Sequence, residues 1–190
     1  MWMRDEAGLV DKTLKGDGSA FEILLHPYRK GILNMAYQIT LNAEDAKDIS
    51  QEAVVRAYKY LKKFKKTKSF KNWIYKITAN AAYDFLRKKR SDQNLIDEKE
   101  RIGLESKSSP EEFYQNRETK KKIEFCLRYL TPKEKTVYML RDIKEFSIKE
   151  TSQTLNISSQ SVRTHLSRAR RKIRSQFERL NQKNGGADGL

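Results

Sequence analysis

The chain has 190 residues, and its 40 Lys or Arg outnumber its 25 Asp or Glu to give a formal net charge of +15. Hydrophobic residues make up only 37% of it, which suffices for one modest core or two small ones and argues against a large single-core enzyme. Such an excess of positive charge favours a polyanionic partner such as nucleic acid.

Membrane and secretion signals are not visible in the sequence. The chain has no run of about 18 apolar residues, and its first residues become acidic at Asp5 and Glu6. We therefore expect a soluble, cytoplasmic protein without membrane insertion. Cys126 is the only cysteine, which excludes an internal disulfide and favours a packing role in a helix. His26 and His165 lie far apart, so we expect no metal site and no cofactor.

The charge is distributed in three blocks along the chain. The first block has 19 basic and 10 acidic residues (net +9), the second has 4 and 8 (net −4), and the third has 17 and 7 (net +10). The acidic block contains a Ser- and Pro-rich run at 106–110, which is typical of a linker. The Gly-rich end is typical of a disordered tail. We expect the domains to be a basic module at 1–90, an acidic linker at 91–118, a second basic module at 119–180 and a tail at 181–190.

Signals for helix starts recur along the chain. In the Ser/Thr-x-x-Glu capping box, two side chains satisfy free amide groups of the first helical turn. No segment alternates between apolar and polar residues as a half-buried strand does, so we expect an all-α fold. The candidate boxes are Ser19 with Glu22, Ser109 with Glu112, Thr131 with Glu134, and Ser147 with Glu150.

In the first module, Asn42 is expected to cap a long helix, and Pro27 is expected to break an earlier one. The helix after Asn42 carries an apolar stripe at three- and four-residue spacing. Its members are Ala46, Ile49, Ala53, Ala57, Leu61 and Phe64. A further helix is predicted from Ser69 to Arg90, with an apolar stripe at Phe70, Ile74, Ile77, Ala81 and Phe85.

Carboxylates gather on the helix after Asn42, where Glu44, Asp45, Asp48 and Glu52 lie on neighbouring turns. Favourable placement near a helix amino terminus is the simplest explanation of each one taken singly. A metal-dependent nuclease site is a competing interpretation, but the sequence lacks a matching histidine or a second carboxylate cluster.

The helix predicted at 69–90 has a second face of aromatic, amide and basic side chains, and a lysine-rich loop at 62–68 precedes it. Aromatic rings stack on exposed bases, Asn hydrogen-bonds base edges, and lysines follow the phosphate backbone. This surface favours single-stranded DNA, although Trp73 and Tyr75 are equally compatible with a core position. The face comprises Trp73, Lys76, Asn80, Tyr83 and Arg87.

The pattern at 147–174 predicts a helix-turn-helix. A short helix at 147–155 is followed by a turn at 156–158 and by a helix at 159–179, whose apolar face has Val162, Leu166, Ala169 and Ile173. Six basic residues and no acidic one occur from Arg163 to Arg174, which favours DNA over a merely solvated helix. The opposite face carries Gln160, Arg163, Thr164, Ser167, Arg168 and Arg171.

Together these segments resemble a known family. Residues 41–58 (LNAEDAKDISQEAVVRAY), 70–80 (FKNWIYKITAN) and 84–90 (DFLRKKR) resemble region 2 of bacterial RNA polymerase sigma factors of the extracytoplasmic-function (ECF) group. Residues 130–135 (LTPKEK), 146–150 (FSIKE), 155–158 (LNIS) and 161–174 (SVRTHLSRARRKIR) resemble region 4. The resemblance covers most of the chain in the family's order. The chain departs from it at Thr151, Ser152 and Thr154, where aliphatic residues are usual, so that helix has less apolar area to bury.

The resemblance implies a non-enzymatic subunit that binds core RNA polymerase and recognises promoter DNA, both duplex and single-stranded. It also implies an anti-sigma factor as a partner. A stand-alone helix-turn-helix regulator, acting as a dimer, remains the alternative. By resemblance, core polymerase would contact Asp45, Asp48, Gln51, Glu52 and Arg56. The −10 element would contact Lys63, Lys65, Lys66, Trp73, Tyr75, Lys76, Asn80, Tyr83 and Arg87, and the −35 element would contact Ser159, Gln160, Arg163, Thr164, Ser167, Arg168 and Arg171.

Overall fold

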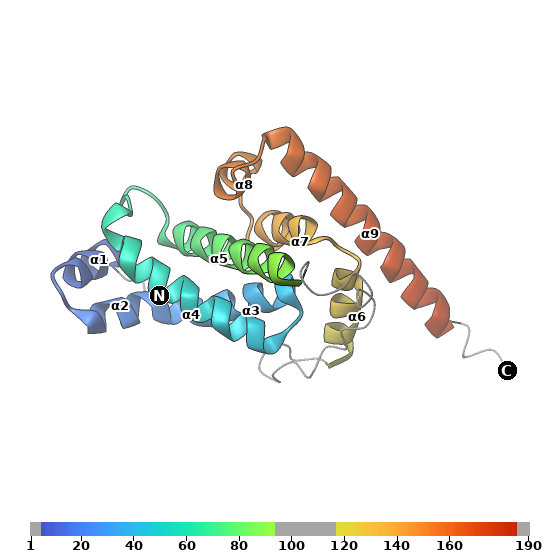
Figure 1. Ribbon diagram of the computed structural model, residues 1–190, viewed down its shortest axis with the longest axis horizontal. Coiled ribbons are helices and arrows are strands. Elements are labelled where there is room, and N and C mark those ends of the chain that lie inside the picture. Colours follow the sequence, from blue (N-terminus) through green and yellow to red (C-terminus); the bar gives the residue numbers. More distant parts are fainter. Residues whose placement is uncertain (1–4, 94–116, 186–190) are drawn as a thin grey trace.

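The computed structural model describes residues 5–93 and 117–185, and these residues are helices joined by short turns, with no strand among them. This confirms the expected all-α class. Figure 1 shows the helices of the amino-terminal half gathered around α5, with the carboxyl-terminal helices packed beside them. In the part of the chain that is described, no helix is long and apolar enough to cross a membrane.

The amino-terminal module consists of five α-helices and two 3₁₀ turns among the described residues. Pro27 lies in the first 3₁₀ turn, where it separates two α-helices as expected. The elements are α1 (Glu6–Leu14), α2 (Gly18–Leu25), η1 (His26–Tyr28), α3 (Arg29–Thr40), α4 (Ala43–Tyr60), η2 (Leu61–Lys63) and α5 (Phe70–Gln93).

Local capping explains where these helices begin. The Asn42 side chain accepts hydrogen bonds from the amides of Glu44 and Asp45, at 2.9 and 3.0 Å, which confirms the predicted start of α4. The box predicted for Ser19 and Glu22 is wrong, because Asp17 is the N-cap of α2. Its carboxylate accepts from the amide of Ala20 and from the Ser19 hydroxyl, and Ser19 itself lies inside the helix, which begins at Gly18.

The carboxyl-terminal module contains the predicted helix-turn-helix. Both capping boxes of this module, Thr131 with Glu134 and Ser147 with Glu150, are present, and the Ser109–Glu112 box lies outside the described residues. The helix that begins at Pro132 continues into a π-helical turn, and Glu145 follows this turn in the left-handed region at φ 62°. The elements are α6 (Arg117–Arg128), α7 (Pro132–Tyr138), η4 (Met139–Ile143), α8 (Ile148–Leu155) and α9 (Ser159–Gly185).

Two boundaries differ from the expectation. Helix α9 continues to Gly185 instead of ending at 179, because residues 180–184 contain no helix breaker before Gly185 and Gly186. Residues 181–185 are therefore helical rather than tail. Helices α5 and α6 also reach into the two ends of the expected linker, to Gln93 and from Arg117, and the residues between them lie outside the described part.

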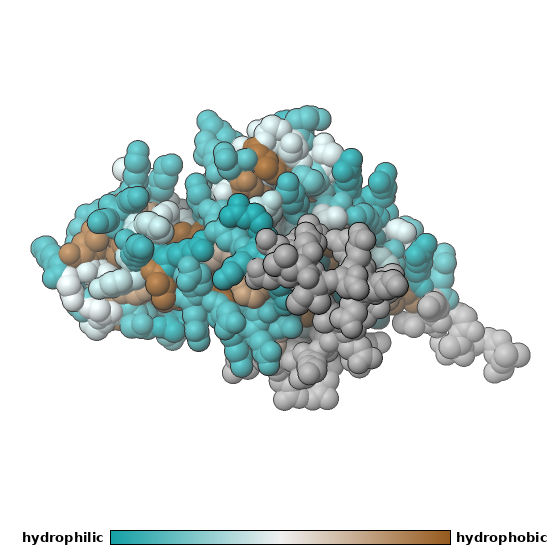
Figure 2. Space-filling view, in the orientation of Figure 1, coloured by the Kyte–Doolittle hydropathy of each residue, from teal (hydrophilic) through white to brown (hydrophobic). Residues whose placement is uncertain are grey.

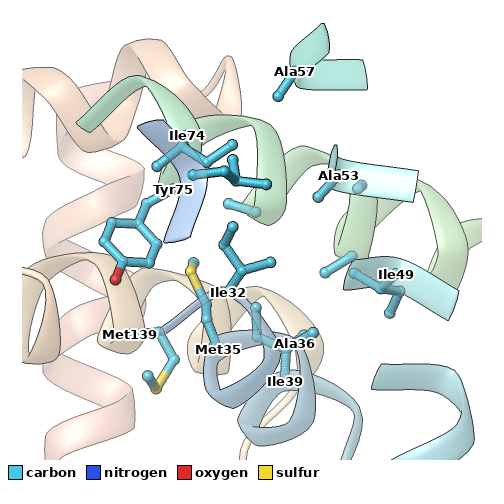
Figure 3. Close-up of a cluster of buried hydrophobic side chains, with 14 of the residues drawn as sticks. Ile32, Met35, Ala36, Ile39, Ile49, Ala53, Ala57, Ile74, Tyr75 and Met139 are labelled. Carbon is cyan, nitrogen blue, oxygen red and sulfur yellow. The ribbon is translucent and has the colours of Figure 1, made fainter. Parts of the chain in front are cut away.

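The two modules share a hydrophobic core. The apolar stripe of α4 is buried at Ala46, Ile49, Ala53 and Ala57, against α3 and α5. The same cluster continues into the carboxyl-terminal module through Met139, Leu140 and Phe146, which are at most 2% exposed. Figure 3 shows Met139 in the cluster with residues of α3 and α5, such as Met35 and Tyr75. The sequence pattern alone did not show that the modules pack together.

Candidate nucleic-acid and protein interfaces

The carboxylate face of α4 is open to solvent where the docking surface was predicted. Asp48, Gln51 and Glu52 are exposed, and their three- and four-residue spacing places them on one side of the helix. Asp45 is different, because its side chain is only 15% exposed and pairs with Lys89 of α5 at 2.8 Å. The exposed part of this face can accept hydrogen bonds and cations from a partner protein.

Arg56, the last predicted docking residue, lies in an ion-pair network between α4 and α5. Its Nε donates to Glu52 at 2.6 Å, and its Nη1 donates to Asp84 of α5 at 2.7 Å. The hydrogen bond that Arg56 donates to Asp84, followed by the one to Glu52, raises the pKa of the Arg56 guanidinium. Arg56 therefore joins α4 to α5 as well as bordering the exposed carboxylates.

The lysine-rich loop between α4 and α5 is exposed. Lys63, Lys65 and Lys66 are all accessible, and Lys63 lies 5.2 Å from the centre of the Tyr60 ring. Lys66 forms an ion pair with Asp11 of α1. Together these cations can follow a phosphate backbone. Figure 2 shows hydrophilic side chains over most of the visible face of the molecule, with apolar patches between them.

The aromatic residues of α5 are held by packing. Trp73 is half-buried, with its ring 5.2 Å from that of Phe64 and 5.4 Å from that of Phe70. Tyr75 is only 6% exposed, and burial raises the pKa of its hydroxyl. In this conformation Tyr75 is a core residue, which is the open alternative that the sequence allowed.

The rest of the α5 face meets the carboxyl-terminal module. Lys76, Asn80 and Tyr83 are half-buried, whereas the side chain of Arg87 near the end of the helix is 76% exposed. Asn80 and Tyr83 line a small cavity of about 30 Å³, whose other walls come from α7, α8 and the turn after α8. The structure thus brings Trp73, Lys76, Asn80, Tyr83 and Arg87 to one face of α5, as predicted, but places part of that face against α7 and α8 and leaves Tyr75 outside it.

The helix-turn-helix is built around three buried residues of α9, which are Val162, Leu166 and Ala169. Asn156 takes the left-handed conformation at φ 50° and ends α8, and the Ser158 hydroxyl accepts from the amide of Ser161 at the start of α9. The predicted −35 residues therefore lie on the outer side of α9. Gln160, Arg163, Ser167, Arg168 and Arg171 are exposed, and Ser159 and Thr164 are half-exposed.

Sequence reasoning missed an arginine-lined hollow beside the recognition helix. It has a volume of about 540 Å³ and lies between α9, α8 and η4. Asp142 holds Arg170 through two hydrogen bonds of 2.9 and 2.6 Å, and Arg141 donates to the carbonyl of Phe146. The stripe at 163, 167, 170, 171 and 174 is a visible helical period, but only the tertiary structure brings Arg141 to it. The hollow is lined by Arg141, Ile148, Arg163, Leu166, Ser167, Arg170, Arg171 and Arg174.

An ion pair joins α9 to α7. Lys172 of α9 donates to Glu134 of α7 at 2.7 Å. Burial alone would raise the pKa of Glu134, but the bonds from Lys172 and the Thr131 amide outweigh it and hold that pKa below its usual value. Lys172 is therefore held in an ion pair within the module. The exposed arginines of α9, which include those at 163, 168 and 171, are cations that a polyanion could reach. No group of three or more His, Cys, Asp or Glu residues suited to a metal ion occurs in the described ranges.

Comparison with known proteins agrees with this arrangement. The family description "Sigma-70 region 2" matches residues 24–92, and "Sigma-70, region 4" matches residues 120–173. The ECF RNA polymerase sigma factor SigW of Bacillus subtilis (strain 168) is 31% identical over 181 residues, which cover 90% of this chain and 96% of that protein. The RNA polymerase sigma-H factor of Pseudomonas aeruginosa is 28% identical over 173 residues, covering 87% and 90%.

Solved structures share the fold. The sigma factor RpoE of Bartonella quintana, in a co-crystal with the anti-sigma factor NepR, has a TM-score of 0.69 and 18% identity, covering 83% of this chain and 96% of that one. CnrH in complex with the cytosolic domain of CnrY has a TM-score of 0.63 and 20% identity, covering 92% and 97%. With the two family matches and the identity to SigW along nearly its whole length, this chain belongs to the ECF group of RNA polymerase sigma factors, which are transcription initiation factors.

Proposed function

We propose that this protein binds core RNA polymerase through α4, holds the −35 promoter element with α9, and captures the opened −10 element with α5 and the loop before it. The observation that carries this proposal is the pairing of an exposed carboxylate face, at Asp48, Gln51 and Glu52, with an exposed arginine face on a separate module. A carboxylate face repels DNA and suits a protein partner, whereas the arginine face attracts DNA. We expect it to act in the cytoplasm, where bacterial polymerase works.

For the −35 element, α9 has the side chains that read duplex DNA. Arg163 and Gln160 lie in the first turns of a recognition helix, where such residues meet base edges in the major groove. The arginine-lined hollow beside them faces the position of a phosphate backbone in this docking mode, because the helix preceding a recognition helix crosses that backbone. The module would therefore combine base reading with phosphate anchoring.

For the −10 element, opening is driven by binding rather than by nucleotide hydrolysis. Unstacking costs roughly 1.4 kcal/mol per base-pair step, and extruding a base costs on the order of a few kcal/mol. Stacking of a captured base returns roughly 1 to 3 kcal/mol, and lysine contacts with the backbone add to it. Lys76 and Asn80 are our best candidates for this capture, supported by the loop lysines and by Trp73, Tyr83 and Arg87, whereas the predicted contact of Tyr75 is not available in this conformation because its side chain is buried.

The proposal is tested by run-off transcription on genomic promoter fragments with purified core polymerase, with and without this protein. Specific start sites that depend on the protein support it. Tight binding to duplex DNA without core, and no initiation with core, would instead support a stand-alone regulator. The solved relative described as a complex with an anti-sigma factor leads us to propose an inhibitory protein partner of the same kind for this chain.

A further inference from the structure

The arginine-lined hollow is built from three elements and is distinct from the centre of the reading face of α9. Its main row of lining residues on α9 is spaced by four, three and four residues, so the row runs along one side of the helix. Further lining residues come from η4 and α8, whereas the exposed Arg168 of α9 does not line the hollow. The row on α9 consists of Arg163, Ser167, Arg170 and Arg174.

Most of the positive charge around the hollow is uncompensated. Asp142 accepts two hydrogen bonds from Arg170, at 2.9 and 2.6 Å, so the charge of that one arginine is balanced. Among the described residues, none of the other four arginines that line the hollow forms an ion pair. Like charges gathered around one concave surface repel one another, and a multivalent anion between them replaces this repulsion with attraction.

Arg141 has hydrogen-bonding capacity that the fold does not use. Its Nη1 donates to the carbonyl of Phe146, which holds the guanidinium beside the hollow. Its Nε is buried and has no acceptor within the described part of the chain. A guanidinium carries five N–H donors in a planar fork that matches the oxygens of a phosphate. Arg141 is therefore fixed in place by one bond and retains donors for a phosphorylated ligand.

The size of the hollow and its apolar residues indicate a ligand larger than a single phosphate. Its volume of about 540 Å³ lies within the range of roughly 300 to 1,000 Å³ that is typical of small-molecule sites. Ile148 of α8 and Leu166 of α9 add apolar surface to the arginines. A planar aromatic base can pack on such surface and stack on guanidinium planes. These features together favour a ligand with several phosphates and a base.

We propose that the arginine-lined hollow binds a free nucleoside polyphosphate, with the phosphates among the arginines and the base against Ile148 and Leu166. Arg163 and Arg171 line the hollow and are also expected to contact the −35 element. A bound nucleotide and duplex DNA therefore compete for these two arginines, and each lowers the affinity for the other. The competition rests on the proposed function, whereas nucleotide binding itself does not.

Calorimetric titration of the full chain with ATP, at constant ionic strength, tests the site. Arg174→Ala is the informative variant, because the described residues contain no ion pair or hydrogen bond of the Arg174 side chain that the fold would lose. Loss of its contact with phosphate should weaken ATP binding about fivefold. Arg179→Ala is the matched control, since Arg179 is exposed on the same helix and does not line the hollow, and it should change the affinity less than twofold.

Equal weakening in Arg174→Ala and Arg179→Ala would show that ATP responds only to the net charge of the chain, and would overturn the proposal. Absence of saturable ATP binding to the wild-type chain would overturn it as well. Circular dichroism spectra that match the wild type establish that both variants are folded.

Tripolyphosphate and inorganic phosphate distinguish the parts of the ligand. Inorganic phosphate should bind most weakly, because it reaches fewer arginines, and ATP should bind more tightly than tripolyphosphate, because its base packs on the apolar residues. Ile148→Ala should weaken binding of ATP about threefold and leave tripolyphosphate unchanged. Equal affinities of the wild-type chain for ATP and tripolyphosphate would overturn the assignment of a nucleoside.

Competition is measured by fluorescence anisotropy of a labelled −35 duplex, with and without ATP at matched ionic strength, because salt alone weakens binding to DNA. ATP should lower duplex affinity in the wild type, and the ratio of the two affinities should approach one in Arg174→Ala. An ATP effect of equal size in both would overturn the competition. If the titrations behave as expected but the chain supports no initiation with core polymerase, the nucleotide site stands and the proposed function fails. Initiation that depends on the chain, together with no saturable ATP binding, has the opposite meaning.

Discussion

Replacement of Lys135 by Met is expected to stabilise the protein at neutral pH. Lys135 is only 8% exposed, and burial, together with the nearby Arg128, lowers the pKa of its ammonium from 10.5 to about 8. Below pH 8 the residue is charged in both the folded and unfolded chains, so the full cost of burying the charge is present. At about 1.4 kcal/mol per pH unit, the difference between the two pKa values corresponds to about 3 kcal/mol.

The sign of the pH dependence follows from proton uptake on unfolding. Between pH 8 and 10.5 the unfolded chain holds a proton on Lys135 that the folded chain has released, so this residue makes the free energy of unfolding rise with pH. The advantage of Lys135→Met should therefore be about 3 kcal/mol at pH 7 and roughly half of that at pH 9.5. For a chain of this length, 3 kcal/mol raises the melting temperature by about 6 to 12 °C.

Urea unfolding followed by far-ultraviolet circular dichroism, at pH 7 and pH 9.5, measures this difference. Lys133→Met is the matched control, because Lys133 lies in the same helix and is exposed. The control should change the free energy of unfolding by less than about 0.5 kcal/mol at both pH values. A difference between wild type and Lys135→Met that is the same at both pH values would refute the reasoning.

Three further predictions concern the proposed interfaces. Arg163→Ala and Arg168→Ala should each weaken binding to a −35 duplex. Where the lost contact is to a phosphate, the slope of log affinity against log salt concentration should become shallower by about 0.9, as measured by anisotropy at several salt concentrations. Unchanged affinity in both variants would contradict the assignment. Asn80→Ala should spare the closed complex but impair opening, and equal permanganate reactivity of the bubble thymines in variant and wild type would count against it. Asp48→Ala combined with Gln51→Ala should reduce core affinity while leaving the circular dichroism spectrum unchanged, and undiminished co-purification with core would contradict the docking face.

Features that depend on a few consecutive residues could be predicted from the sequence. The starts of α4, α7 and α8 follow from Asn42, Thr131 and Ser147, whose side chains reach amides within their own turn. The one wrong box shows the limit of this reasoning. Asp17 and Ser19 both precede an apolar run, and the carboxylate, a stronger acceptor than a hydroxyl, takes the amide of Ala20.

Features that depend on contacts between distant residues could not be predicted. Met139 and Phe146 are apolar, but nothing in the sequence around them indicates that the other module buries them. Tyr75 shows the same limit. An aromatic residue on a helix is compatible with base stacking or with a core, and the close approach of Gly31 of α3 and of Lys144 places Tyr75 in the core.

Glu150 lies at the contact between α8 of the helix-turn-helix and α5. The sequence predicted that α8 has little apolar area, and Thr151 and Thr154 are indeed buried there, with the Thr151 hydroxyl donating to the carbonyl of Ser147. Polar contacts at its first turn must therefore supply part of what apolar packing usually supplies. Glu150 provides them with both oxygens, since one accepts from the Ser147 amide at 2.8 Å and the other from Asn72 at 2.9 Å.

The hydrogen bond from the Ser147 amide, followed by hydrogen bonding with the Ser147 side chain, lowers the pKa of Glu150. This carboxylate therefore stays ionised at neutral pH. The capping bond lies within α8, whereas the bond to Asn72 joins α8 to α5. An aliphatic residue at position 150 would make neither bond, so the Ser147 amide and the Asn72 side chain would both lose this acceptor.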